Sequence, residues 1–325
     1  MIFHIYKGDA SISSRLHFQK TIPTIKKHKI VDNLKYLDFK LFKYSGDNSV
    51  FIFHQHAMLL NLIMVYFFCM VKMIKVRIVF DVHDLNEIKY NKTVKSYVFF
   101  SMIFALEFIV FKLPGVRFIT VSKGLSRLLW LKYNKKVPVV YNMSDDIDLL
   151  SCCKYNNQKR IVYFGQINQN RLPLDLLVEL LSGGYSVDIY GYFSGCTSSY
   201  EFEFERLKNE CKLMFKGRYS PDNIGDLIRV YDFSLIYFDD DRLNIKFCMP
   251  NKLLQSLSLG VPVIISEGLF EIYNTLSLSG FIYSFDDLTL NKGMSKCIDY
   301  NCLEAKLNKM KNVSIKNFTS CIGEV

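Results

Sequence analysis

Residues 250–260 (PNKLLQSLSLG) place a lysine at the start of a short apolar segment. Pro250 suits the first turn of a helix, and Gly260 is typical of a helix end. The N–H groups of a helix start, with the ammonium group of Lys252 beside them, would stabilise an anion such as a phosphate. A buried helix of an α/β sheet has the same pattern. The motif therefore predicts either a phosphate site or an ordinary core helix.

A second stretch, DVHDL at residues 81–85, places His83 between two carboxylates directly after an apolar run. A histidine held by a carboxylate can act as a general base or bind a hydroxyl group. His83 and Asp84 are therefore the candidate catalytic residues. The alternative is a structural histidine followed by a helix-capping Asp84.

Two further histidines resemble half of a metal site. His54 and His56 are two residues apart, so they are expected to point the same way at one strand end. No third ligand is evident, and the acidic run Asp239–Asp241 is expected to be a solvated loop. We therefore predict no metal and no cofactor. The nine cysteines contain no CxxC pair, which indicates reduced thiols in a cytoplasmic protein.

Around these residues, strand-like and helical segments alternate in two series. The strand-like runs are Ile2–Tyr6, Val50–His54, Val76–Asp81, Arg117–Val121 and Val137–Tyr141, and then Arg160–Phe164, Val187–Tyr190, Leu213–Phe215, Phe233–Tyr237, Val263–Ile265 and Gly280–Ser284. Strands separated by helices predict α/β domains with doubly wound parallel sheets. We expect an N-terminal domain at 1–145, a linker at 146–159 and a C-terminal domain at 160–325. Ligands bind at the carboxyl ends of such strands, which suggests a cleft between the two domains.

The charge of the chain is positive and uneven. Its net charge is +10, and residues 1–45 hold nine Lys and Arg against three Asp. Such a patch attracts a phosphorylated substrate, nucleic acid or anionic lipid, although a solvated helix face has the same composition. The apolar segments 57–71 and 97–111 are each shorter than the roughly 20 residues needed to span a bilayer, so we expect buried helices there.

The motifs, taken together, resemble those of the GT-B glycosyltransferases, in particular the bacterial family 4-like enzymes that build surface polysaccharides. The resemblance spans residues 50–265 and depends on PNKLLQSLSLGVPVI, YFGQINQNRLPLDLL, DVHDL and ITVSKGL. It implies two Rossmann-like domains facing across a cleft, a nucleotide-sugar donor and no metal. The donor-binding residues that it implies are Gly165, Gln166, Arg171, Tyr190, Gly191, Asn244, Pro250, Asn251, Lys252, Leu253 and Gln255.

The resemblance also has departures. The family's paired glutamates correspond here to Phe247 and Gln255, and Gln166 stands where the family usually has an arginine. An uncharged Gln255 would bind the donor ribose more weakly than a carboxylate does.

The expected acceptor is a lipid-linked oligosaccharide of O-antigen or capsule synthesis, at the cytoplasmic face of the cell membrane. Basic residues would face the acceptor or the membrane there, namely Arg15, Lys26, Lys27 and Lys29. The alternatives are a nucleotide-sugar epimerase of the same fold and a non-catalytic partner subunit. Nucleic-acid binding has the net charge as its sole support.

Overall fold

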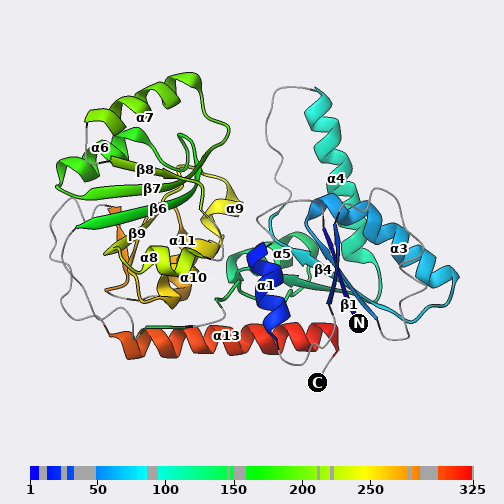
Figure 1. Cartoon of the computed structure of the whole chain (residues 1–325). Coiled ribbons are helices and arrows are strands. Elements are labelled where there is room, and N and C mark those ends of the chain that lie inside the picture. Colours follow the sequence, from blue (N-terminus) through cyan, green and yellow to red (C-terminus); the bar gives the residue numbers. More distant parts are fainter. Residues whose placement is uncertain are drawn as a thin grey trace. The chain divides into compact units, whose positions relative to one another are not determined.

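The computed structural model divides into two compact units, Met1–Asp145 with Met310–Val325, and Asp146–Lys309 (Figure 1). It describes residues 1–6, 13–22, 28–32, 49–85, 94–144, 147–149, 159–210, 213–219, 223–276, 278, 280–285 and 299–323. Both units are α/β structures with parallel sheets, as the alternating sequence pattern predicts. The predicted fold class, two doubly wound parallel-sheet domains, is confirmed.

The N-terminal unit contains a five-stranded sheet in the order β2-β1-β3-β4-β5. Its strands are β1 (Ile2–Tyr6), β2 (His28–Asp32), β3 (Val50–His54), β4 (Arg77–Val82) and β5 (Val116–Thr120). Its helices are α1 (Ser13–Thr21), the 3-10 turn η2 (His56–Met58), α3 (Leu59–Val71), α4 (Val94–Lys112) and α5 (Lys123–Tyr133). Strands β3 and β4 are buried along almost their whole length because helices cover both faces of the sheet.

The C-terminal unit contains a six-stranded parallel sheet in the order β11-β10-β9-β6-β7-β8. Its strands are β6 (Arg160–Ile167), β7 (Ser186–Phe193), β8 (Leu213–Gly217), β9 (Phe233–Ile236), β10 (Val263–Ile265) and β11 (Ile282–Ser284). Its helices are α6 (Leu174–Ser182), α7 (Ser198–Glu210), α8 (Ile224–Ile228), α9 (Leu243–Lys246), α10 (Asn251–Ser258) and α11 (Phe270–Leu276). Alternate residues of β6 enter two apolar clusters, Tyr163 on one face and Phe164 on the other.

The strand orders locate the ligand-binding edge of each sheet. Counted along the chain within each unit, they read 2-1-3-4-5 in the first and 3-2-1-4-5-6 in the second, which are the two common doubly wound arrangements. The order reverses between β1 and β3 and between β6 and β9. Ligands of such sheets bind beyond the carboxyl ends of the strands at these reversals.

The long C-terminal helix corrects the predicted domain boundary. The sequence assigned all of 160–325 to the C-terminal domain, but in α13 (Tyr300–Ile322) the part from Met310 onward belongs to the N-terminal unit. Buried Phe318 and hydrogen bonds explain this, because Arg77 and Arg117 donate to carbonyl groups at the end of α13.

The same helix explains why one predicted strand does not form. Val137–Tyr141 contributes a single bridge, between Val139 and Thr120. Other backbone groups of this segment bond to α13 instead, since Tyr141 N–H donates to Ser314 Oγ and the Val139 carbonyl accepts from Asn317.

Of the helices that the structure describes, none is long and apolar enough to cross a bilayer.

Candidate functional site

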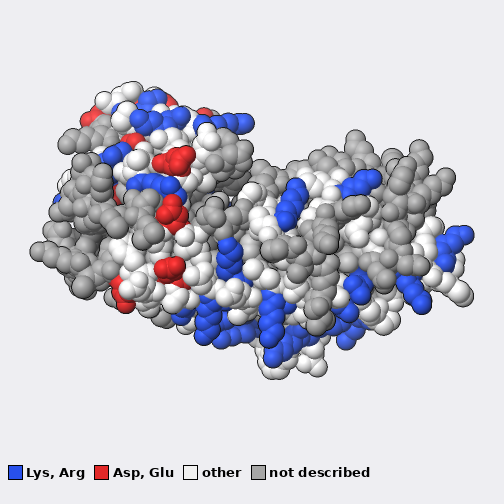
Figure 2. Space-filling model, turned by 60° about the horizontal axis from the view of Figure 1, so that its bottom comes forward, with Lys and Arg blue, Asp and Glu red and all other residues white. Residues whose placement is uncertain are grey.

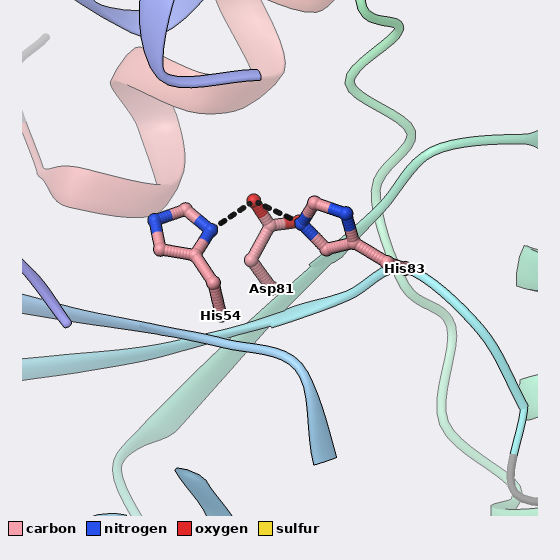
Figure 3. A group of neighbouring side chains, drawn as sticks. All are labelled: His54, Asp81 and His83. Carbon is pink, nitrogen blue, oxygen red and sulfur yellow. Dashed lines mark ion pairs between the residues drawn. The ribbon is translucent and has the colours of Figure 1, made fainter. Parts of the chain in front are cut away.

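A buried carboxylate, Asp81 near the end of β4, is the centre of the polar cluster in the N-terminal unit. Arg15 of α1 donates to both of its oxygens, from Nε to Oδ2 and from Nη2 to Oδ1, each at 2.8 Å. Gln19 Nε2, one turn later on α1, donates to Oδ2 at 3.1 Å. The imidazoles of His54 and His83 lie on either side of the carboxylate, at 3.1 and 3.4 Å from Oδ2 (Figure 3). Side chains of α1, of the end of β3 and of the residues after β4 thus all contact the Asp81 carboxylate.

Arg15 is therefore not part of a basic surface, and its predicted role toward an acceptor or membrane is wrong. Its side chain is fully buried. Besides Asp81, its guanidinium group bonds to the Val140 carbonyl and, at 3.0 Å, to Asn142 Oδ1. These bonds use four of the five N–H donors of a fully buried guanidinium group, so Arg15 presents no exposed charge to an external anion.

Three histidines from neighbouring strands continue the cluster away from Asp81. His4 of β1 lies between His54 and His28, with ring nitrogens 3.2 and 2.8 Å apart. Burial lowers the pKa of His54 and lowers that of His4 well below its usual range, so both rings are neutral. A neutral His54 that donates its Nδ1–H to Asp81 has an unprotonated Nε2. That nitrogen must therefore accept a hydrogen bond from Nδ1–H of His4. The carboxylate thereby determines the tautomer of each ring in turn.

The ionisation of Asp81 follows from the same contacts. Burial acts to raise the pKa of its carboxyl group, but the Arg15 guanidinium and the neighbouring imidazoles act against it and hold the pKa well below its usual range. An ionised Asp81 orients His83 with Nε2–H toward the carboxylate. The lone pair of His83 Nδ1 is then the group that can accept a hydroxyl proton.

His54, Asp81 and His83 form the three-ligand set that the sequence did not reveal, since their ligand atoms all lie within 4.8 Å of one another. Two imidazoles and a carboxylate suit several divalent metals. Here, however, Arg15 already occupies both carboxylate oxygens, and its positive charge would oppose a cation at the same position. These three side chains therefore fit a metal poorly. Their arrangement suits a hydrogen-bonded cluster in which Asp81 orients the imidazoles.

His56 does not belong to this cluster, which corrects the expectation that it points with His54. Strand β3 ends at His54, and Gln55 has a positive φ of 70°. The chain therefore turns, and His56 Nε2 contacts the buried Glu107 of α4 at 3.2 Å. Lys132 of α5 pairs with the same carboxylate at 3.1 Å.

The remaining predicted residues of this unit lie as follows. Asp84 is exposed directly after His83, so Asp81 and not Asp84 contacts the imidazole. Lys29 is an exposed residue of β2. Lys26 and Lys27 lie outside the described residues.

In the C-terminal unit, the end of β6 and the start of α10 meet around Lys252. Gly165 has a φ of 138°, and a Cβ atom there would overlap the Lys252 amine. Gly191, its partner on β7, could not carry a Cβ atom without overlapping the Gly165 carbonyl. Both glycines permit a close approach, and the amine of Lys252 lies over the rings of Tyr163 and Phe164, 4.9 and 5.3 Å from their centroids.

A second cation, Arg171, lies near Lys252. It ends a tight turn in which the side-chain oxygen of Asn168 accepts from the N–H groups of Asn170 and Arg171. The guanidinium group stacks over Phe238, which follows β9, at 4.3 Å. Arg171 and Phe238 therefore follow β6 and β9, the two strands between which the sheet order reverses.

The positive charge of Arg171 acts on Lys252 and also on the carboxyl group of Asp240, whose pKa it helps to lower. Burial, and secondly the positive charge of Arg171, lower the pKa of Lys252 to about 7. Among the side chains that the structure describes, no carboxylate forms an ion pair with either residue. Positive charge without an ion-pair partner, at a helix start and a sheet switch point, is an arrangement that can bind a phosphate or diphosphate.

The other predicted donor residues lie on the same elements or on neighbouring ones in the sequence. Pro250 precedes α10 at its N-cap position, Asn251 is the first residue of the helix, and Gln255 lies one turn after Lys252 and is partly exposed. Gln166 is exposed, and its Nε2 lies 3.3 Å from the Tyr192 hydroxyl. Asn244 lies on the short helix α9 and is partly exposed.

Two of the predicted donor residues have other roles. Leu253 is a core residue, because its side chain is fully buried and its N–H donates to the Pro250 carbonyl. The Tyr190 hydroxyl lies 3.3 Å from that of Tyr231, which in turn donates to Asp188.

Sequence reasoning missed the aromatic rings beneath the cations and the partners of Asp81. From the sequence, Tyr163 is an ordinary residue of the predicted strand Arg160–Phe164, and Phe238 belongs to the loop after Phe233–Tyr237. The signal that could have singled out Phe238 is its position directly after β9. His4, Gln19 and Arg15 carry no such signal, since they are far from Asp81 along the chain.

Comparison with known proteins gives the fold. No family model matches the sequence, and no curated protein matches it. Among solved structures, the chain is similar to the lipopolysaccharide outer core galactosyltransferase WaaB, with 13% identity, 99% of each chain covered and a TM-score of 0.63.

Two more solved structures are similar. The α,α-trehalose 6-phosphate synthase of Burkholderia multivorans has 11% identity over 87% of this chain and 73% of that one, with a TM-score of 0.57. An α-glucosyltransferase in complex with UDP-glucose and DNA containing an abasic site has 12% identity over 98% and 95%, with a TM-score of 0.55. At this identity the likeness shows the fold alone, and that fold is the two-domain GT-B fold of two Rossmann-like units.

Proposed function

We propose that this protein is a glycosyltransferase that binds a nucleotide-sugar in its C-terminal unit and transfers the sugar to a hydroxyl group. The observation that carries the proposal is the pair Lys252 and Arg171, which form no ion pair with a described carboxylate and lie near the switch point of a Rossmann-type sheet. A nucleoside diphosphate supplies the two negative charges that this site lacks. The similar fold of WaaB and of the UDP-glucose-bound α-glucosyltransferase supports this choice of ligand.

The chemistry of the site suits a leaving diphosphate. Breaking the bond between sugar and phosphate moves negative charge onto the diphosphate, and cations held in place before the reaction stabilise that charge most. Lys252, Arg171 and the start of α10 supply positive charge without a metal. His83, oriented by Asp81, is assigned to the hydroxyl group, either as its base or as its hydrogen-bond acceptor.

The finer part of the proposal concerns the acceptor and its location. We assign the protein to the family 4-like enzymes of surface polysaccharide synthesis, with a lipid-linked oligosaccharide as acceptor, and to the inner face of the cell membrane. Its support is the order of the motifs along the chain and the basic N-terminal unit.

A nucleotide screen followed by a product assay tests the proposal. UDP, GDP and dTDP are titrated into the wild type, into Lys252→Met and, as a matched control, into Lys216→Met, which removes an exposed lysine of the same unit. We expect one nucleotide to bind the wild type and the control, and to bind Lys252→Met much more weakly.

The outcomes separate the alternatives. If no nucleotide binds, or if Lys252→Met binds as the wild type does, the site assignment is wrong. If the nucleotide binds but mass analysis detects no transfer to a lipid-diphosphate acceptor, the assigned acceptor is wrong, and a nucleotide-sugar that also stays unchanged on its own favours the non-catalytic partner subunit. Interconversion of the free nucleotide-sugar without transfer would identify an epimerase.

A further inference from the structure

Two helices of the N-terminal unit expose apolar side chains along most of their length. On α3, Leu60, Met64, Phe67 and Val71 recur at helical spacing and form one outward stripe. On α4 the exposed apolar side chains are Val94, Tyr97, Val98, Phe99, Met102, Phe104, Phe108 and Ile109. Figure 1 shows the N-terminal part of α4 extending beyond the sheet. We call these outward stripes the α3–α4 surface.

A helix in contact with water normally carries charged residues on its outer face, and most of the length of α3 and α4 carries none there. From Leu59 to Val71 there is no charged residue. From Tyr97 to Phe111 there is one, Glu107, which is fully buried against His56 and Lys132. Large exposed apolar surfaces of this kind are binding surfaces for a membrane or another protein.

The charges at the borders of this surface are positive. Lys72 caps the end of α3, Lys75 follows it, and Lys112 ends α4. All three are exposed. Lys132 lies 4.7 Å from the ring centroid of Phe104, so a cation also contacts the apolar residues directly. An apolar stripe with lysines at its end matches the boundary between acyl chains and anionic headgroups.

The other exposed charged side chains of the N-terminal unit are also mostly positive. Its exposed cations include Lys20, Lys29, Lys72, Lys75, Lys112, Arg117, Lys123, Arg127, Lys136 and Lys316. Among its described side chains, Asp84 is the one exposed acid. In Figure 2, the described surface of this unit shows Lys and Arg and no Asp or Glu.

A pocket adjoins the α3–α4 surface. Its volume is about 330 Å³, and its lining includes Met70 and Met73 at the end of α3, Pro114 and one charged residue, Lys75. Apolar walls with a cation at the rim suit an acyl chain that carries a phosphate.

We infer that the α3–α4 surface inserts into an anionic lipid bilayer, with Lys72, Lys75 and Lys112 at the headgroups. The inference rests on the membrane association in the proposed function, for which it names the surface. A second copy of the chain fits less well, because pairing two such surfaces would bring lysines against lysines. Insertion of both helices would keep them parallel to the bilayer plane, which needs no spanning helix.

Vesicle flotation of the full chain tests this inference. Vesicles of phosphatidylcholine, alone or mixed equally with phosphatidylglycerol, are used at low and high salt. Phe67→Glu and Phe99→Glu remove exposed rings from α3 and α4, with Phe202→Glu as a matched control. Phe202 is an exposed helical phenylalanine of the C-terminal unit, 71% accessible against 51% for Phe67 and 53% for Phe99.

We expect the wild type and Phe202→Glu to float with the anionic vesicles, and each α3–α4 variant to bind about tenfold more weakly or worse. Lys72→Gln and Lys75→Gln should each weaken binding about fivefold at low salt, whereas Lys216→Gln should not. Circular dichroism and thermal unfolding establish that the variants fold, as exposed positions should allow.

Three results would overturn the inference. They are the absence of flotation with anionic vesicles, flotation that the α3–α4 variants leave unchanged, and a wild-type dimer in light scattering that Phe67→Glu dissociates. Nucleotide binding is measured on the same variants without vesicles. Loss of flotation with intact nucleotide binding therefore concerns this surface alone, and loss of nucleotide binding in the wild type concerns the proposed function.

Discussion

The affinity for a nucleoside diphosphate should fall as pH rises from 7 to 9, because Lys252 loses its proton in the free protein over this range. The amine lies over two aromatic rings with no carboxylate paired to it, and burial lowers its pKa to about 7. A bound diphosphate provides the missing anion and returns the pKa toward the ordinary value of 10.5. The charged amine is thus favoured in the complex, and binding takes up a proton.

The size of the effect follows from the two pKa values. In the free protein, the fraction of Lys252 that is charged falls from about one half at pH 7 to about one hundredth at pH 9. If the complex keeps the amine charged, the dissociation constant rises about 50-fold over this interval, which corresponds to about 2.3 kcal/mol. Below pH 6 the amine is already charged, so its contribution to the pH dependence ends there.

Calorimetry with UDP in two buffers of different ionisation enthalpy measures the proton uptake directly. We expect about 0.9 proton per UDP at pH 8 and about 0.5 at pH 7. A terminal phosphate with a pKa near 6 is ionised throughout the range from 7 to 9, so the ligand does not confuse the result. Lys252→Met should bind more weakly and take up no proton, while Lys216→Met should behave as the wild type.

Two results would refute this reasoning. Strong wild-type binding without a pH slope would mean that the Lys252 amine does not contact the diphosphate. A slope that persists in Lys252→Met would place the titrating group elsewhere, and the assignment of α10 as the donor helix would lose its main support.

Three further predictions concern Gln255, Arg15 and the need for a metal ion. Gln255→Leu should weaken donor binding about two- to tenfold, the loss of one neutral hydrogen bond, whereas Gln255→Glu should retain activity; a Leu variant with unchanged affinity would remove Gln255 from the site. Arg15→Met should lower the free energy of unfolding in urea by about 3–5 kcal/mol, because it leaves the Asp81 carboxylate buried and unpaired. Since the pKa of Asp81 is lowered in the folded state, this loss should be complete above pH 4 and shrink as the carboxylate is protonated in acid; a loss that does not change with pH would contradict the ion-pair account. Sugar transfer should persist in a chelator, and activity that disappears there and returns with Mn²⁺ would show that a metal takes part.

The sequence predicted the relative positions of the residues around Lys252 better than those around Asp81, for a physical reason. Lys252, Gln255 and the end of α10 belong to one continuous helical segment, so their relative positions follow from helix geometry alone. Gly165 and Gly191 come directly after the predicted strands Arg160–Phe164 and Val187–Tyr190, which the sequence pattern reveals. The fold class could be predicted in the same way, because local periodicity determines which segments are strands and helices.

The cluster around Asp81 could not be predicted in this way. Its members come from α1, β1, β3 and β4, and no local pattern determines which of these segments are neighbours in space. Arg15 was therefore counted among the basic residues of 1–45, although it is fully buried. A charge count records how many cations a segment has and nothing about what each of them pairs with.

Ion pairing also distinguishes the buried structural cation, Arg15, from the two cations that we propose to bind the donor, Lys252 and Arg171. A charged group that leaves water needs a partner of opposite charge, or its pKa shifts until the charge is lost. Arg15 has its partner in Asp81, held through two oxygens, so its charge is used within the fold. Lys252 and Arg171 have no such partner among the described residues, and Lys252 responds with a pKa lowered to about 7. Two cations held close together destabilise the folded protein, and a bound anion offsets that destabilisation. We therefore place the diphosphate there, and not at the larger group of charged residues around Asp81.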